Sequence, residues 1–399
     1  MIDSTIMRLG LLFLLSAATA LAGGFPGMWD ASILAGGRQV PFRMEISLAP
    51  ARVCFFEDTQ PVCSTAARVE GEALTAEWDY LNTELHLALK PDSLEGVYRS
   101  RRTKREYPIA AHPQRAPETA GQAPAQVGGE WEVHSTEKPE LSWQLLLRQT
   151  GSELKGTILR VDGDDGTLVG QVRGNTFAIS HFSGDRPGLL EGSLLADGTL
   201  SLQLMNTKLY ALRPAVARAR KLTPPEDPHT FAKARNPAEP FRFSLPDLRG
   251  RTVTQADFAS KPWIVSIAGS WCPNCRDEAP FLVELYKQYH ARGLEIVAFC
   301  FEYSADPTYA PLHAFLRKYG ITYPVVLAGE PDQLEAVVPQ IENLKAFPTS
   351  IYIGRDGRVR AVHTGFPSAG SGEELNRVED ELRGLVERMI AEPARGTKN

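Results

Sequence analysis

A pair of cysteines, Cys272 and Cys275, stands between a predicted strand and a predicted helix, and few folds accommodate that placement. The apolar run Trp263–Ala268 indicates a buried strand, and the apolar residues after the pair recur with a helical period. At the start of a helix, unpaired backbone N–H groups and the positive end of the helix dipole stabilise a thiolate. Pro273 suits the first helical position, where a missing N–H does no harm. The pattern predicts a redox-active dithiol on an α/β scaffold.

The two cysteines have different expected roles. Cys272, at the helix N-cap, should attack a disulfide, and Cys275, one turn later and more shielded, should resolve the mixed disulfide. A zinc half-site would need a second Cys or His pair, and the remaining cysteines and eight histidines form no such cluster. A c-type haem would need a histidine where Arg276 stands. A purely structural disulfide is the other alternative, although so short a loop is a poor staple. We therefore expect neither a metal nor a cofactor.

Strands and helices alternate around this pair, which is typical of an α/β domain. We place the domain at 241–392, followed by a tail at 393–399. The predicted strands are 263–268, 294–301, 350–353 and 358–363, and the predicted helices are 272–292, 312–319 and 373–391.

The N-terminal half has another pattern, in which short apolar runs alternate with turns and show no helical period. This pattern favours antiparallel β-structure. The segments 23–112 and 127–213 open alike, each with a Gly-x-Trp-acidic motif, at Trp29 and at Trp131. We predict two similar β-rich modules, each forming or sharing a barrel or sandwich, with a spacer over 113–126. The expected fold is multidomain, with these modules followed by the α/β domain.

The first residues have the features of a secretory signal peptide. Arg8 precedes the apolar stretch Leu9–Leu21, and Ala20-Leu21-Ala22 is a small-residue cleavage pattern. We expect 1–22 to direct export, in a bacterium to the periplasm, with cleavage after Ala22. The alternative is an N-terminal membrane anchor, for which the stretch falls short of the roughly 20 residues of a spanning helix.

Residues 214–240 contain six prolines among charged residues, which predicts an extended, semi-rigid linker. The net charge of −5 is slight for 399 residues. Composition therefore gives no reason to expect a nucleic-acid partner.

Residues 241–392 resemble the TlpA/ResA-like branch of the thioredoxin superfamily. The resemblance implies a thiol–disulfide oxidoreductase that exchanges disulfides with protein substrates and has an upstream redox partner. It also implies a cis-proline at Pro348 facing the disulfide. It rests on the Phe241–Gly250 opening, on Trp271-Cys272-Pro273-Asn274-Cys275, on Pro280 and on Phe347-Pro348-Thr349.

The same resemblance points to Glu278 as a proton-handling group. Ordinary thioredoxins carry a buried acid six residues before the first cysteine, where this chain has Ser266, whereas the TlpA/ResA-like branch uses a glutamate three residues after the second. On the predicted helix, Glu278 is the one charged member of an apolar stripe that includes Cys275. Lost solvation should raise its pKa. The competing interpretation is that Glu278 reaches solvent or supports the helix N-terminus.

Three functions remain open at this point. A WCPNC reductase is favoured, because the Pro-Asn pair lacks the charged histidine that would further stabilise a thiolate. A peroxiredoxin-like peroxidase is the first alternative, but Gly269 stands where the threonine of its Pro-x-x-x-Thr-x-x-Cys motif belongs. The second is a binding or scaffold protein with an accessory redox domain, and the ligand of its β-rich modules is unknown.

The other cysteines and two further motifs receive simpler interpretations. A loop over Glu57–Gln60 would place Cys54 opposite Cys63 in a hairpin, so we expect a structural disulfide there, the alternative being two buried free thiols. Cys300 lies in an apolar run and is expected to be an inert core thiol. Asp162–Gly166 is interpreted as a turn rather than a calcium loop, and the basic run Arg99–Arg105 as a solvated hairpin tip.

Overall fold

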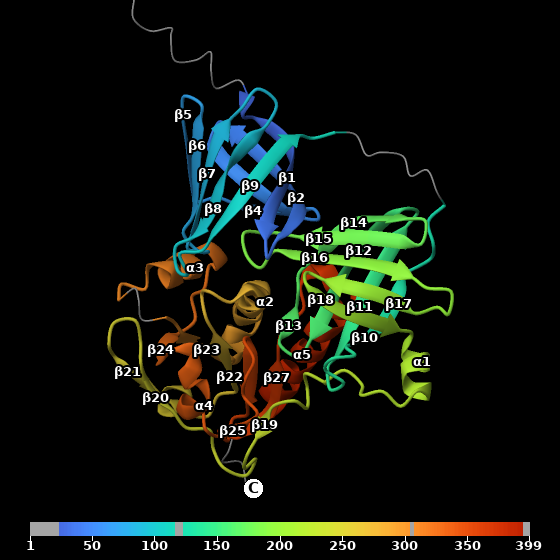
Figure 1. Cartoon of the computed structure of the whole chain (residues 1–399). Helices are drawn as coiled ribbons and strands as arrows, with labels where there is room; N and C mark the ends of the chain where they lie inside the picture. The colour runs from blue at the N-terminus through green and yellow to red at the C-terminus, as the bar shows by residue number, and fades with distance from the viewer. Residues whose placement is uncertain (1–23, 116–122, 304–306, 394–399) are drawn as a thin grey trace, which may run out of the picture.

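A computed structural model describes residues 24–115, 123–303 and 307–393. It contains two β-barrel-like modules followed by an α/β domain (Figure 1). The expected signal segment, the centre of the expected spacer and most of the tail lie outside the described residues. Within the described ranges, no helix has the length and apolar character needed to cross a membrane.

The first barrel is a nine-stranded antiparallel sheet that curls around an aromatic core. Its strands pair in chain order, β1 also pairs with β9, and β4 and β5 form the two edges. Side chains from the end of β6 reach the β4 edge, since Trp78 and Tyr80 donate hydrogen bonds to the carbonyls of Val62 and Cys63 at 3.2 and 3.1 Å. The strands are β1 (Gly27–Ala35), β2 (Arg38–Leu48), β3 (Ala51–Glu57), β4 (Gln60–Cys63), β5 (Ala66–Glu70), β6 (Ala73–Trp78), β7 (Thr83–Leu89), β8 (Leu94–Ser100) and β9 (Glu106–Pro113).

The second barrel is closed. Eight strands pair in chain order, and β10 pairs with β18 to complete the ring, while the short β13 attaches to β12. Closure leaves no unpaired edge among these eight strands, which is how barrels avoid exposed edges. The strands are β10 (Gly129–His134), β11 (Ser142–Thr150), β12 (Glu153–Arg160), β13 (Gly163–Asp164), β14 (Leu168–Arg173), β15 (Thr176–His181), β16 (Gly188–Leu194), β17 (Leu200–Leu204) and β18 (Thr207–Leu212).

The two barrels start in the same way. The indole N–H of Trp29 donates to the carbonyl of Phe25 at 3.0 Å, and that of Trp131 donates to the carbonyl of Val127 at 2.8 Å, four residues back in each case. Both indole rings are buried in their barrels. The expected pair of β-rich modules is therefore confirmed, the first as an open, barrel-like sheet and the second as a closed barrel.

A disulfide joins Cys54 in β3 to Cys63 in β4. The two residues are cross-strand partners, with Phe55 opposite Val62 in the next pair. The bond lies in the hairpin at the β4 edge of the first barrel.

The segment 214–240 differs from the extended linker expected there. Pro214–Ala219 forms the short helix α1, because proline is well suited to the first turn of a helix. Further on, β19 (Lys233–Ala234) pairs with β25 (Ile341–Glu342), and Ala232 lies in the core of the α/β domain. The domain therefore begins before residue 241, because the backbone of 233–234 finds hydrogen-bond partners in it.

The α/β domain has a five-stranded sheet in the order β24-β23-β22-β26-β27, in which the first three strands are parallel and the last two antiparallel. The pattern-based prediction omits β24, a strand of five residues. The elements are β20 (Ser244–Pro246), β21 (Thr252–Thr254), β22 (Trp263–Ala268), α2 (Pro273–Tyr289), β23 (Glu295–Phe301), α3 (Ala310–Tyr319), β24 (Val325–Gly329), α4 (Leu334–Val337), β26 (Thr349–Ile353), β27 (Val359–Thr364) and α5 (Glu373–Ala391).

Helices and an N-terminal segment cover the two faces of this sheet. Leu282 of α2, Phe315 of α3 and Leu382 of α5 share one core, whereas Phe241 and Phe243 pack in the core of the other face. All six residues of β22 are buried, as expected of a central strand covered on both faces. The start of α2 is thereby fixed at the end of β22.

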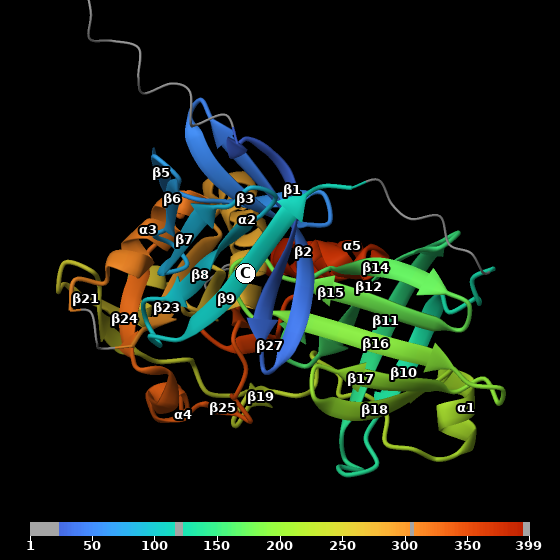
Figure 2. The ribbon, with the colours of Figure 1, turned by 45° about the horizontal axis from the view of Figure 1, so that its top comes forward.

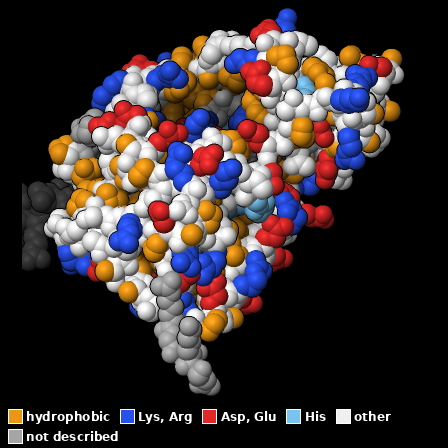
Figure 3. Space-filling view, turned by 90° about the horizontal axis from the view of Figure 1, so that it is seen from below, with side chains coloured by type: hydrophobic (Ala, Val, Ile, Leu, Met, Phe, Trp, Pro, Cys, Tyr) orange, Lys and Arg blue, Asp and Glu red, His pale blue; other side chains and the backbone are white. Residues whose placement is uncertain are grey.

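The two barrels stand side by side against the α/β domain (Figures 1 and 2). The Ser180 hydroxyl donates to the Pro41 carbonyl at 2.7 Å, and the buried Tyr98 hydroxyl of the first barrel donates to the Gly184 carbonyl of the second at 2.8 Å. Acidic and basic side chains are interspersed on the face that Figure 3 shows.

Candidate active site

The end of β22 and the start of α2 position Cys272 and Cys275. Cys272 is the N-cap of α2 in an extended conformation, and Pro273 is the first helical residue. The Cys272 sulfur accepts a hydrogen bond from the Cys275 backbone N–H at 3.2 Å. The sulfur therefore faces the positive end of the helix dipole, the environment that stabilises a thiolate.

Both sulfurs are buried free thiols, since Cys272 is 3% exposed and Cys275 is 2% exposed. Greater shielding of Cys275 is thus not what distinguishes them. Burial raises the pKa of Cys275 well above its ordinary value, the hydrogen bond with Cys272 and the charge of Cys272 raise it further, and Glu278 adds the smallest contribution. This environment keeps Cys275 in the thiol form, which is a weaker nucleophile than the thiolate.

Glu278 lies in the interior, three residues after Cys275 on α2, and is 2% exposed. Its carboxylate accepts hydrogen bonds from the Ser350 hydroxyl at 2.7 Å and from the Ser266 hydroxyl at 3.1 Å. Burial raises the pKa of Glu278 to about 7, although both serine hydrogen bonds lower it. A carboxyl group with such a pKa can take up or release a proton near neutral pH.

Pro348 lies on the approach to β26, and the Phe347–Pro348 peptide bond is cis. The Pro348 carbonyl accepts from the Gly365 N–H at 2.8 Å. The rings of Trp271 and Phe347 meet edge to face with centroids 5.1 Å apart. The structure thus gathers the expected site residues at the end of the sheet where α2 begins.

One acidic residue of the site, Glu302, lacks a motif of its own in the sequence. Glu302 is 9% exposed and receives both the Ser270 N–H and the Ser270 hydroxyl at 2.7 Å, so it holds the turn before Cys272 in place. Burial raises the pKa of Glu302. A usable signal is its position immediately after β23, because functional side chains gather at the carboxyl ends of parallel strands.

The second barrel also contacts the site, because two of its residues form hydrogen bonds with the Asn274 side chain of α2. The Asn274 side-chain NH₂ donates to the Asp162 carbonyl at 2.7 Å, and its carbonyl accepts from the Arg186 guanidinium at 2.7 Å. The segment Asp162–Gly166, which was expected to be a turn, contains the short strand β13, which folds back onto β12, and the segment packs against Asn274. Within the described ranges, no group of three or more Cys, His, Asp or Glu side chains is arranged to hold a metal ion.

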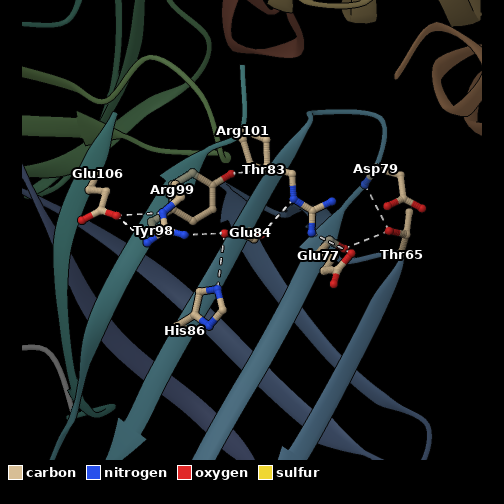
Figure 4. Close-up of polar contacts among 10 residues, drawn as sticks. All are labelled: Thr65, Glu77, Asp79, Thr83, Glu84, His86, Tyr98, Arg99, Arg101 and Glu106. Atoms are coloured by element: carbon tan, nitrogen blue, oxygen red, sulfur yellow. Dashed lines mark hydrogen bonds and ion pairs between the residues drawn. The ribbon is translucent and has the colours of Figure 1, made fainter. Parts of the chain in front are cut away.

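The basic run Arg99–Arg105 forms the predicted hairpin tip between β8 and β9, but the tip is not simply solvated. Arg102 lies over the Tyr303 ring of the α/β domain, 4.7 Å from the ring centroid. Nearer the barrel, Arg99 and Arg101 both pair with Glu84 (Figure 4). Burial of Glu84 opposes its ionisation, but the hydrogen bond and the charge of Arg101 prevail and lower its pKa. Acidic partners on the barrel thus hold part of the basic run.

Cys300 lies in β23 within the helix-covered core, and burial raises the pKa of its thiol well above the ordinary value. Reactivity requires the thiolate, so this environment is unfavourable for reaction.

Comparison with known proteins places the C-terminal part of the chain. A family model named Redoxin matches residues 233–382. The thiol-disulfide oxidoreductase ResA of Bacillus thuringiensis subsp. konkukian is 33% identical over 119 residues, which cover 29% of this chain and 62% of that protein. ResA of Bacillus subtilis is 30% identical over 123 residues, which cover 31% of this chain and 64% of that protein. The chain therefore spans less than two thirds of the length of these relatives.

Among solved structures, a thiol:disulfide interchange protein of the thioredoxin family from Chlorobium tepidum is 26% identical, with a TM-score of 0.31, and the match covers 39% of this chain and 99% of that one. The family match and the ResA similarity together identify the domain that carries the two cysteines. Residues 233–382 thus match the Redoxin family and are similar to the ResA thiol-disulfide oxidoreductases.

Proposed function

We propose that this protein is an exported thiol–disulfide oxidoreductase that reduces protein disulfides through its WCPNC site. The observation that carries the proposal is a dithiol at a helix N-terminus with a buried carboxyl group, Glu278, whose pKa is about 7. The ResA relatives support the reaction class. The signal-like segment at 1–22 supports export.

Reduction would proceed in two exchanges. The Cys272 thiolate attacks one sulfur of the substrate disulfide, a Cys272–substrate bond forms, and the other substrate sulfur leaves as a thiolate. Cys275 then attacks Cys272, releases the second substrate thiol and closes the Cys272–Cys275 disulfide. Two electrons pass from the dithiol to the substrate, and an upstream dithiol partner must return them.

Glu278 is suited to the second exchange. Cys275 must lose its proton to attack, and burial raises the pKa of this thiol. We propose that the Glu278 carboxylate takes up that proton, directly or through water, and returns it in the reverse reaction. Pro348 would face the bound substrate, with Trp271, Pro273 and Asn274 supporting the dithiol.

The reductive direction rests on the residues between the cysteines. Pro273 and Asn274 supply no positive charge to stabilise a Cys272 thiolate, and a dithiol whose thiolate is less stabilised is the better reductant.

Insulin reduction by the full chain, supplied with a chemical dithiol, tests the proposal. The wild type should reduce insulin with turnover and should oxidise a reduced unfolded protein more slowly. Cys272→Ser should remove the activity, whereas Cys300→Ser, which alters a thiol in the core, should keep it. Equal activity of the wild type and Cys272→Ser would refute the proposal.

A further inference from the structure

Two loops of the second barrel pack over the start of α2, where they contact Asn274 and Arg276 beside the dithiol, and we call them the roof loops. They are residues 161–167, between β12 and β14, and residues 182–187, between β15 and β16. In this arrangement Cys272 and Asn274 are each only 3% exposed. A disulfide substrate must reach the Cys272 sulfur in line, so the cover bears directly on access.

The roof loops hold both ends of one side-chain amide. The Asn274 NH₂ donates to the Asp162 carbonyl in one loop, and the Asn274 carbonyl accepts from Arg186 in the other, each at 2.7 Å. The bond from Arg186 is charge-assisted and therefore stronger than a neutral one. Asn274 lies between the two cysteines in sequence, so the latch acts at the dithiol itself.

Two glycines allow the backbone of the first roof loop to pack closely against Asn274 and the segment that follows β27. Gly163 has φ +117°, and a Cβ there would stand 1.9 Å from the Asn274 side-chain nitrogen. A Cβ on Gly365 would stand 2.4 Å from the Gly163 backbone nitrogen. Because the Gly365 N–H is bonded to the Pro348 carbonyl, the first roof loop lies beside the face on which Pro348 would meet a substrate.

Further contacts reinforce the cover around its rim. Asp164, which is 2% exposed, accepts from the Ser368 N–H at 2.8 Å and from the Ser368 hydroxyl at 3.0 Å. Arg276 of α2 pairs with Asp185 of the second roof loop at 3.5 Å. These contacts join the second barrel to the α/β domain. If the second barrel moved away, the side chains that make them would become exposed to water.

The second roof loop also separates two cavities, each of about 390 Å³. Trp271, Arg102 and Arg186 are among the residues that line one of them. Asn274, Arg276 and Asp185 are among those of the other. The two cavities therefore reach the residues on either side of Cys272, namely Trp271 in one and Pro273 and Asn274 in the other. A folded protein, which is too large for these cavities, would meet the roof loops first.

We propose that the roof loops form a gate, latched between Arg186 and Asn274, that withholds Cys272 from protein disulfides until the second barrel moves away. The inference rests on the proposed redox function and adds a selecting element to it. Arg186 and Gly163 act on access alone and take no part in the exchange of bonds.

The test measures alkylation of Cys272 in the reduced full chain, with peptide mapping to identify the modified cysteine. N-ethylmaleimide serves as the small reagent and a polyethylene-glycol maleimide as the bulky one. Arg186→Ala removes the latch, and Gly163→Ala wedges the loop from Asn274. Each should raise the bulky-reagent rate at Cys272 roughly tenfold, which corresponds to about 1.4 kcal/mol of gate closure. The small-reagent rate should rise less.

Matched controls separate gating from general loosening. Gly151→Ala carries the same left-handed backbone requirement, with φ +59° and open space around the position, in the β11–β12 hairpin. Arg220→Ala removes an exposed arginine next to α1, away from α2 in Figure 1. Both should behave as the wild type. Unchanged bulky-reagent rates in Arg186→Ala and Gly163→Ala, or equal increases in the controls, would overturn the gate.

The gate and the redox function fail in different ways. Exchange between the reduced wild type and a small aromatic disulfide reports on the dithiol without a protein substrate. If that exchange is absent, the proposed function fails. If it occurs while all four variants alkylate alike, only the gate fails.

Discussion

Replacing Glu278 by glutamine should change how the stability of the redox domain depends on pH. The folded protein holds the Glu278 carboxyl at a pKa of about 7, against an ordinary value of 4.5, mainly because it is buried. Between these two pH values the unfolded chain has lost a proton that the folded chain keeps. The carboxyl therefore destabilises the fold progressively from pH 4.5 upwards, with an upper limit of about 3 kcal/mol reached above pH 7.

Alkylation of Cys300 in the full chain measures this effect within the redox domain. Cys300 is 2% exposed in β23, so its modification requires local opening of that core. At each pH, the ratio of wild-type to Glu278→Gln rates cancels the titration of the exposed thiol. We expect this ratio to increase by roughly two powers of ten between pH 5 and pH 8.

The change of this rate ratio with pH tests whether Glu278 has a raised pKa, whereas the absolute value of the ratio does not. Glutamine alters the hydrogen bonds to Ser266 and Ser350 by an amount that does not vary with pH, which moves all points together. Glu284→Gln is the matched control, since its side chain lies on the same helix and is 64% exposed. A flat ratio for Glu278→Gln would show that this carboxyl is ionised in the fold at low pH or reaches solvent.

Three other changes have defined outcomes. Cys275→Ser should accumulate mixed disulfides with partner proteins on non-reducing gels, whereas Cys272→Ser should give few, because only the first keeps the attacking thiol. Peptide mapping of oxidised protein should recover Cys54 linked to Cys63, and replacing both by serine should lower the unfolding free energy of the first barrel by roughly 2–3 kcal/mol. Tyr98→Phe should lower stability to denaturant by about 1 kcal/mol, because a carbonyl of the second barrel loses its buried donor.

Each of these outcomes has a clear contrary. Equal trapping by the two serine variants would mean that the attacking and resolving roles are wrongly assigned. Free thiols at positions 54 and 63 would contradict the Cys54–Cys63 disulfide. Tyr107→Phe removes the hydroxyl of a half-buried tyrosine on the neighbouring strand of the same barrel, where its hydrogen bond is exposed, and should have little effect. If Tyr107→Phe lowered the stability as much as Tyr98→Phe, burial of the Tyr98 hydroxyl would not explain the effect of Tyr98→Phe.

Local patterns in the sequence suffice for much of the redox domain. The predicted bounds of β22 and α5 coincide with those in the structure, because a continuous apolar run and a helical period are both strong local signals. The N-cap position of Cys272 and the burial of Glu278 follow from helix geometry over a few residues. The pairing of Cys54 with Cys63 likewise depends only on the length of one hairpin loop.

Contacts between modules have no comparable local signal. Asp162 and Arg186 meet Asn274 across 112 and 88 residues of chain, and their Asp- and Gly-rich surroundings indicate a turn without saying what the turn packs against. The same holds for Arg102, whose basic neighbours resemble a solvated loop until Tyr303 is placed beside it. Residues 233–234 join the α/β domain by pairing with β25, more than a hundred positions away.

The pairing of first and last strands in both barrels bears on how such a chain could be assembled from parts. In the first barrel Trp29 lies opposite Pro113, and in the second Glu132 lies opposite Leu212, so each barrel is entered and left on neighbouring strands. Adjacent strands are about 5 Å apart, so a short connection is enough to append or repeat such a unit without disturbing its ladder. A duplicated barrel can thus be inserted in tandem before a catalytic domain without changing its own strand pairing. The loops at one end of the barrel can then acquire new contacts with that domain.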